Sequence, residues 1–210
     1  MGFFNKLFWG SSKKFANDVT NNVSKAKEQK IKNKVETFNT VSQDFYDRKN
    51  FIDDCTTLMV DVVNCFTEEE SDTEQEKVLI KEMSDYYQKE KRKIEENGTV
   101  PVPQSIESDY SDMLQQYNQV LTYIEKFINQ RQWAKSTELE EYYQQTRELS
   151  AKQMYNEITE EEYSQALKSL TSPPNPLEGT GESISDVIQK LNEYNQALTH
   201  TGESILNKLG

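Results

Sequence analysis

Few side chains in this 210-residue sequence could carry acid–base, nucleophilic or metal chemistry. It has one histidine, His200, and two cysteines, Cys55 and Cys65. A cysteine nucleophile needs a base within reach, and His200 is far from both cysteines in the sequence. A di-iron helix bundle needs a Glu-x-x-His motif on two helices, which a single histidine does not supply. The sequence also lacks a glycine-rich phosphate loop and a Cys/His zinc spacing. We therefore expect no catalytic residue, no metal and no cofactor, in a protein that is not an enzyme.

The remaining candidates for chemistry are better explained by structure. If Cys55 and Cys65 share a helix, ten residues at about 1.5 Å of rise each hold them too far apart for a disulfide, so we expect two reduced core cysteines. The glutamate clusters at 68–70 and 160–162 lack the Asp/Asn and Gly spacing of a calcium loop and are typical of a solvated face. No apolar run approaches the ~18 residues of a membrane-spanning helix, and no signal peptide is recognisable, so we expect a cytoplasmic protein.

Two long segments of the chain are free of helix-breaking residues and are expected to form long helices. Residues 11–97 and 104–172 contain neither glycine nor proline, and these two residues cost about 1 and 3 kcal/mol in a helix interior. Apolar residues recur there every three or four positions, which is typical of a helix with one buried stripe. The fold class we expect is all-α: an elongated antiparallel bundle or coiled-coil-like hairpin of long helices, with an N-terminal amphipathic arm and short C-terminal helices.

The stripes predict individual elements. One rod is expected over 28–67, and a second over 105–156 with a slip of the stripe near 131–136. Between them lies an acidic, turn-prone patch at 68–76. A third helix is expected over 77–97, with its apolar residues facing inward: Val78, Ile80, Met83, Tyr87 and Ile94.

The predicted organisation has four parts: a basic amphipathic arm over 1–27, a long-helix bundle over 28–170, a Pro/Gly linker over 171–181 and C-terminal helices over 182–210. Thr180 or Ser183 can cap the first helix after the linker. The pentapeptide TGESI occurs at 180–184 and again at 201–205. We interpret both copies as helix starts, with a tandem repeat as the alternative.

Charge is divided unevenly along the chain. Residues 1–34 contain eight lysines and two acids, a net charge of +6, whereas the rest of the chain carries −18. Such a body repels anionic surfaces, so contact with one must be made by the arm. Phe3, Phe4, Leu7 and Phe8 fall on one helical face with Trp9 at its edge. The membrane-binding residues that we predict are these five and the lysines beside them, Lys6, Lys13 and Lys14.

The arm has two alternatives to membrane contact. It could fold back and fill a groove between the protein's own helices. Nucleic-acid binding is disfavoured, because the arm has no arginine for base or phosphate contacts and belongs to an acidic chain.

Residues 149–170 resemble a known bacterial module. Their features are an apolar helix end at Met154 and Tyr155, a turn at Ile158 and Thr159, a capping box from Thr159 to Glu162, and a stripe that follows it: Tyr163, Ala166, Leu167 and Leu170. This pattern is similar to the short C-terminal domain, a helical hairpin often called SHOCT. That family usually has glycine before the turn, where this chain has Asn156 and Glu157. The resemblance implies association or tethering, in a protein of bacterial or phage origin.

A weaker resemblance is one of layout. An amphipathic arm that leads into a long helix, here over 25–65, looks like the beginning of an N-BAR membrane-curving domain. The second rod departs from that family, because it carries Glu138, Glu140, Glu141 and Glu148 in place of lipid-gripping basic clusters.

These observations lead to two functional hypotheses. The first is a non-enzymatic helical scaffold or adaptor, peripheral to the cytoplasmic membrane surface, that binds anionic lipid through its arm and associates with itself or a helical partner through its long apolar stripes. The alternative is a soluble helical assembly or partner-binding protein, related to phage or secretion, whose N-terminus packs on itself or on a partner.

Overall fold

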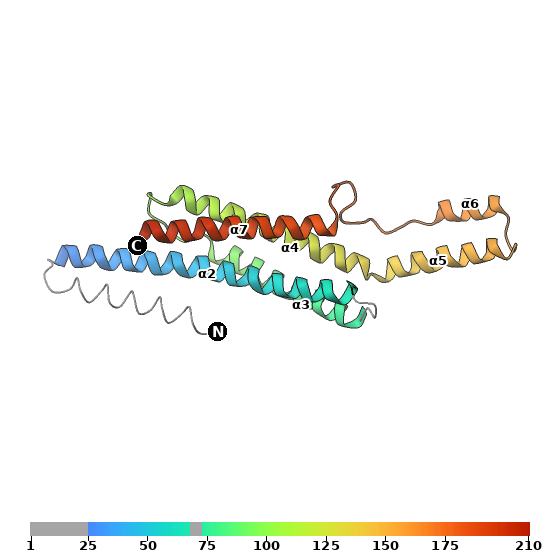
Figure 1. The fold of residues 1–210 in the computed structure, drawn as a ribbon, viewed down its shortest axis with the longest axis horizontal. Helices are drawn as coiled ribbons and strands as arrows, with labels where there is room; N and C mark the ends of the chain where they lie inside the picture. The colour runs from blue at the N-terminus through green and yellow to red at the C-terminus, as the bar shows by residue number, and fades with distance from the viewer. Residues whose placement is uncertain (1–24, 68–72) are drawn as a thin grey trace.

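The computed structural model describes residues 25–67 and 73–210. Helices account for most of this part of the chain: α2 (Lys25–Thr67), α3 (Thr73–Asn97), α4 (Glu107–Ala134), α5 (Thr137–Met154), α6 (Glu160–Ser169) and α7 (Ile184–Leu209). The described residues contain no strand, so the predicted all-α class is confirmed. Helices α2, α3, α4 and α7 form an elongated up-and-down bundle, and α5 and α6 extend from one end of it (Figure 1).

The bundle core is built from the apolar stripes of its four helices. Helix α4 packs most extensively on α7, α2 packs on α3, and contacts of α2 with α7 and of α3 with α4 close the bundle. Side chains at intervals of three or four residues are buried along α2 and α4, as the sequence predicts; examples are Val41, Phe45, Ile52 and Met59 of α2, and Tyr110, Met113, Tyr117, Val120, Ile124 and Phe127 of α4. Helix α7 buries Val187, Leu191, Leu198 and Ile205. Cys55 and Cys65 are buried and unbridged, as expected.

The predicted rod over 105–156 is interrupted in the structure. Helix α4 ends at Ala134, and α5 begins at Thr137 after Ser136, whose extended backbone and side-chain oxygen cap it by accepting a hydrogen bond from the Leu139 amide. The slip that the sequence shows near 131–136 is therefore a helix boundary. One rod was the wrong prediction because Ser136 supplies a capping group within an unbroken run of helix-forming residues.

The predicted register of α3 is wrong at its start. Ile80, Met83 and Tyr87 are buried, but Val78 is 64% exposed. At 100° per residue, Val78 lies on the opposite side of the helix from Ile80. Glu76 takes the inward position one turn before Ile80 and is fully buried, although the sequence assigns it to an acidic turn.

The second TGESI copy does not begin a helix. In the first copy, Ser183 and Asp186 form a capping box that starts α7. The second copy lies inside α7, so the predicted short C-terminal helices are one helix of 26 residues. Gly202 is buried against Phe45 of α2, and a Cβ atom there would lie 2.1 Å from the ring. This glycine allows α7 and α2 to approach closely.

Candidate functional site

Helices α5 and α6 form a hairpin, residues 137–169, that stands outside the bundle. The two helices pack on each other and extend beyond the starts of α3 and α7 (Figure 1). Tyr143, Met154 and Tyr155 are 52%, 74% and 69% exposed, whereas large apolar side chains of the bundle are mostly buried. We call residues 137–169 the projecting hairpin and take it as the candidate functional site, because exposed apolar side chains on a protruding element favour contact with a partner.

The turn at the end of the projecting hairpin is sharply defined. Asn156 has a φ of 57°, in the left-handed region that glycine usually occupies. The Asn156 amide donates to the Gln153 carbonyl at 3.0 Å, and the Glu157 amide donates to the Lys152 carbonyl at 2.8 Å. These two bonds make a Schellman motif, which satisfies the last carbonyls of α5. Asn156 thus ends α5 in the left-handed conformation that glycine most often supplies at this position.

A capping box starts α6, as the sequence predicts. The Glu162 amide donates to the Thr159 hydroxyl at 3.2 Å, and the Thr159 amide donates to the Glu162 carboxylate at 2.8 Å. The hydrogen bond from the Thr159 backbone, followed by that from its hydroxyl, lowers the pKa of Glu162. Two amides at the start of α6 are therefore satisfied within the chain.

A buried ion cluster holds the base of the projecting hairpin. Glu76 at the start of α3 is fully buried; it accepts a 2.9 Å hydrogen bond from Arg131 Nε, and Lys135 Nζ lies 2.8 Å from its other carboxylate oxygen. A buried carboxylate is costly unless paired, and here Glu76 is paired with two cations. Because Lys135 directly precedes the cap of α5, the cluster fixes where the hairpin leaves the bundle.

The segment that leads from α6 back to the bundle is also held near the end of α4. Trp133 Nε1 donates a hydrogen bond to the Pro173 carbonyl at 3.1 Å. Leu177 is buried, and its amide donates to the Asn175 side chain. Both connections of the projecting hairpin to the bundle are thus held by specific contacts.

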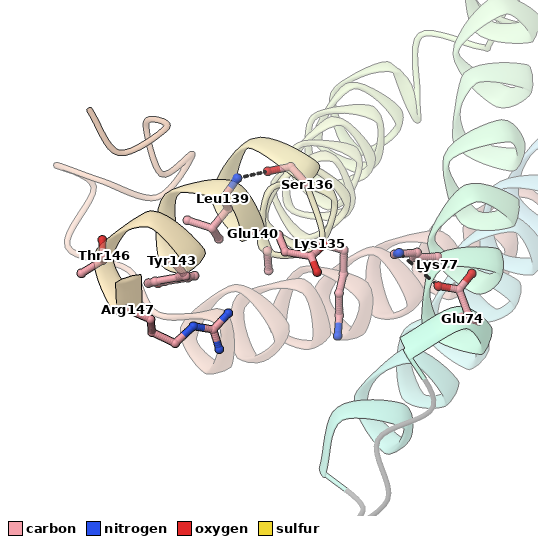
Figure 2. Close-up of a pocket in the computed structure, with 10 residues that line it drawn as sticks. Glu74, Lys77, Lys135, Ser136, Leu139, Glu140, Tyr143, Thr146 and Arg147 are labelled. Carbon is pink, nitrogen blue, oxygen red and sulfur yellow. Dashed lines mark hydrogen bonds and ion pairs between the residues drawn. The ribbon is translucent and has the colours of Figure 1, made fainter. Parts of the chain in front are cut away.

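A shallow groove of about 540 Å³ follows the base of the projecting hairpin. Figure 2 shows Leu139, Tyr143 and Arg147 of α5 on one side of it, and the ion pair of Glu74 and Lys77 at the start of α3 on the other. The lining combines apolar surface with both signs of charge, which suits a peptide or helix surface better than a small charged molecule.

A second polar region lies within the bundle. Arg48 donates two hydrogen bonds of 2.9 Å to Asp44 and stacks over the Tyr117 ring at 4.7 Å. The Tyr110 hydroxyl donates to Asp44 at 2.7 Å, and the Tyr117 hydroxyl donates to Glu90 at 2.8 Å. Burial, and secondarily the charge of Glu90, raises the pKa of Tyr117. The groups satisfy one another, so the network joins α2, α3 and α4.

The sequence-predicted site lies elsewhere. Its residues, Phe3, Phe4, Lys6, Leu7, Phe8, Trp9, Lys13 and Lys14, are outside the part of the chain that the structure describes. Within the described part, no helix combines the length and apolar character needed to cross a bilayer. No three His, Cys, Asp or Glu side chains of residues 25–67 and 73–210 gather as a metal site would require.

Neither the buried ion cluster of Glu76 nor the exposure of the projecting hairpin was predicted from the sequence. Glu76 precedes Ile80 by four positions, and Arg131 follows Phe127 by four, so both continue apolar stripes. Opposite charges at apolar-stripe positions of two neighbouring helices were the sequence signal that could have predicted this buried ion cluster.

This chain matches no family model, no curated protein and no solved structure. The SHOCT-like and N-BAR-like resemblances therefore stay predictions.

Proposed function

We propose that this chain is a non-enzymatic helical scaffold or adaptor at the cytoplasmic surface of a membrane, anchored by residues 3–14 and presenting the projecting hairpin to a partner. The observation that carries the adaptor function is the placement of the hairpin: it stands outside the bundle with Met154 and Tyr155 exposed at its end (Figure 1). A rigid body with one protruding, partly apolar element suits the presentation of a binding surface.

The bundle itself favours the hairpin over the long stripes as the contact surface. The stripes of α2, α3, α4 and α7 are buried against one another within one chain. Association through those stripes, as expected from the sequence, would require the bundle to open. A partner can bind the projecting hairpin while the bundle stays closed.

The membrane part of the proposal rests on the composition of the arm. Its four apolar side chains on one face would supply several kcal/mol at roughly 1.5 to 3 kcal/mol for each fully buried side chain, less the cost of ordering a short helix. Lysines beside them add about 1 kcal/mol each near an anionic surface. The remaining chain carries −18, so the arm must supply the attraction.

Vesicle flotation tests the membrane proposal. The parent should float with vesicles of phosphatidylcholine and phosphatidylserine, more at higher phosphatidylserine and less at higher salt. Deletion of 2–14, or Phe4→Gln with Phe8→Gln, should abolish flotation. The matched control is Asn5→Gln with Ser12→Gln, which alters the arm off its apolar face and should float like the parent. All variants should melt like the parent.

The projecting hairpin also favours a second function, a soluble partner-binding protein whose arm packs on the protein. That function is indicated if the parent does not float with vesicles of any composition and the arm variants have melting temperatures well below that of the parent. Such a result would rule out the membrane anchor.

A further inference from the structure

We infer that copies of this chain associate head to tail, with the end of the projecting hairpin of one copy docked on the lysine-rich start of α2 of the next. This deepens the proposed scaffold function, on which it rests, by naming a second copy as a partner of the hairpin. Two surfaces of opposite charge, at opposite ends of the molecule, carry the inference.

The first surface is the hairpin tip, residues 154–161. Met154 and Tyr155 are 74% and 69% exposed, the two most exposed large apolar side chains in the described residues. Glu157, Glu160 and Glu161 follow them closely in the sequence, are exposed, and form no ion pair with any described residue. The whole projecting hairpin has eight acids and three bases, a net charge of −5. The tip therefore presents exposed apolar side chains together with exposed acidic ones.

The second surface is the basic start of α2, residues 29–35. At 100° per residue, Ile31 and Val35 form one stripe, with Lys30 and Lys34 on one side of it and Lys32 on the other. The three lysines are exposed and make no ion pair with the described part of the chain, whereas Ile31 and Val35 are half-buried. This surface combines an apolar stripe with a basic rim, the complement of the hairpin tip.

The two surfaces cannot meet within one molecule. The first turns of α2 extend past the C-terminal end of α7, and the projecting hairpin leaves the opposite end of the bundle (Figure 1). The 43 residues of α2 alone span roughly 60 Å. Contact between tip and basic start therefore requires a second copy. Because the two surfaces differ, each copy keeps one of each for another neighbour, which gives an open chain or, if the rotation closes, a ring.

The expected interface is small and salt-dependent. A pair of helix ends buries less area than the roughly 1,200 Å² of the smallest stable complexes, so the contact is weak in dilute solution. Opposite charges speed the encounter and set its orientation. Anchoring several copies on one membrane would raise their effective concentration and make a weak contact sufficient for a scaffold.

Sedimentation velocity of the full chain without lipid tests the inference. At about 20 mM NaCl the weight-average sedimentation coefficient should rise with protein concentration, and at about 500 mM NaCl it should stay at the monomer value, because screening shortens the range of the attraction. A parent that stays monomeric over the whole concentration series at low salt would overturn the inference.

Three charge-reversal variants locate the contact. The first reverses the basic start (Lys30→Glu, Lys32→Glu, Lys34→Glu). The second reverses the hairpin tip (Glu157→Lys, Glu160→Lys, Glu161→Lys). The matched control makes the same charge change as the first, at exposed positions of α3 (Lys81→Glu, Lys89→Glu, Arg92→Glu). The first two should each weaken association about tenfold or more, and the control should associate close to the parent.

An equimolar mixture of the first two variants provides the rescue. Each variant alone presents like charges at both ends, but in the mixture every end finds a partner of opposite charge, so association should return. A mixture that stays monomeric, or a control as defective as the first variant, would overturn the inference.

Deletion of 2–14 separates this inference from the membrane proposal. The deleted chain should lose flotation but keep its salt-dependent association, because the basic start of α2 is intact. Loss of association on that deletion would place the contact in the arm and overturn docking on α2. Association without flotation in the parent would instead remove the membrane proposal and leave the head-to-tail contact standing.

Discussion

Substitution of Gly202 by alanine tests the close approach of α7 to α2. The added Cβ would lie 2.1, 2.3 and 2.7 Å from three atoms of the Phe45 ring, where carbon atoms prefer about 3.5 to 4.0 Å. The ring is only 1% exposed, so it cannot turn into solvent. Either Phe45 leaves its rotamer or α7 shifts away from α2 by more than 1 Å.

Two effects oppose each other in Gly202→Ala. Alanine favours a helix over glycine by about 1 kcal/mol, and overpacking a core costs typically 1 to 3 kcal/mol. Because three ring atoms are overlapped at once, the steric cost should be near the upper end, and we expect a net loss of about 2 kcal/mol. For a chain of this size, that lowers the melting temperature by roughly 4 to 8 °C.

A double-mutant cycle isolates the cause. Phe45→Leu removes the ring, so in that background Gly202→Ala should cost little or stabilise by about 1 kcal/mol through helix propensity. Circular dichroism melts of the four proteins give the coupling. If the single variant Gly202→Ala, which keeps Phe45, melts at or above the parent, α7 does not run past Phe45 as an unbroken helix. The second TGESI copy would then again qualify as a helix start.

Two further predictions concern helix ends and pH. Thr159→Ala should cost about 1 kcal/mol of α6 stability while Thr159→Ser costs little, because serine keeps the capping oxygen. Hydrogen exchange of the α6 amides measures this stability. Equal protection of those amides in both variants would contradict a capping role for the Thr159 hydroxyl. Glu182 accepts hydrogen bonds from Lys126 and Lys190, which lower its pKa to about 2. Its contribution to stability is therefore complete above the ordinary glutamate pKa and is lost as pH falls through about 2. Urea unfolding should show a weaker fall in stability between about pH 5 and pH 2 for Glu182→Gln than for the parent, and identical profiles would contradict this origin.

Local signals in the sequence were sufficient for the helical class, for the cap of α6 and for the buried stripes of α2 and α4. Side chains that cap a helix act within three residues, so the capping box of Thr159 with Glu162 was predicted from the sequence and is confirmed. Of the two caps predicted for the helix after the linker, Thr180 and Ser183, it is Ser183 that starts α7. The spacing of apolar residues likewise placed the buried stripes of α2 and α4 correctly. These features depend on neighbours along the chain, which the sequence displays directly.

Features that depend on distant partners were not predicted. Gly202 resembles a helix breaker until Phe45 is known to lie against it. Glu76 belongs to an acidic run, and only Arg131 and Lys135, more than fifty positions away, explain its burial. The same limit applies to the candidate site: the hairpin's turn was foreseen, but its projection from the bundle depends on how the other helices pack.

The buried charges at the base of the hairpin explain why this projection is a defined one. The apolar contacts of α4 run to Phe127 and Ile128, and beyond them its last turn is held to α3 by Glu76, Arg131 and Lys135. Ion pairs and hydrogen bonds depend on direction, whereas apolar contact does not, so such a cluster selects one position for the last turn of α4. With Trp133 holding the returning chain at Pro173, both ends of the hairpin are fixed relative to the bundle. A surface presented from two fixed ends loses less conformational freedom on binding than one on a free tail, which is what an adaptor requires of its contact surface.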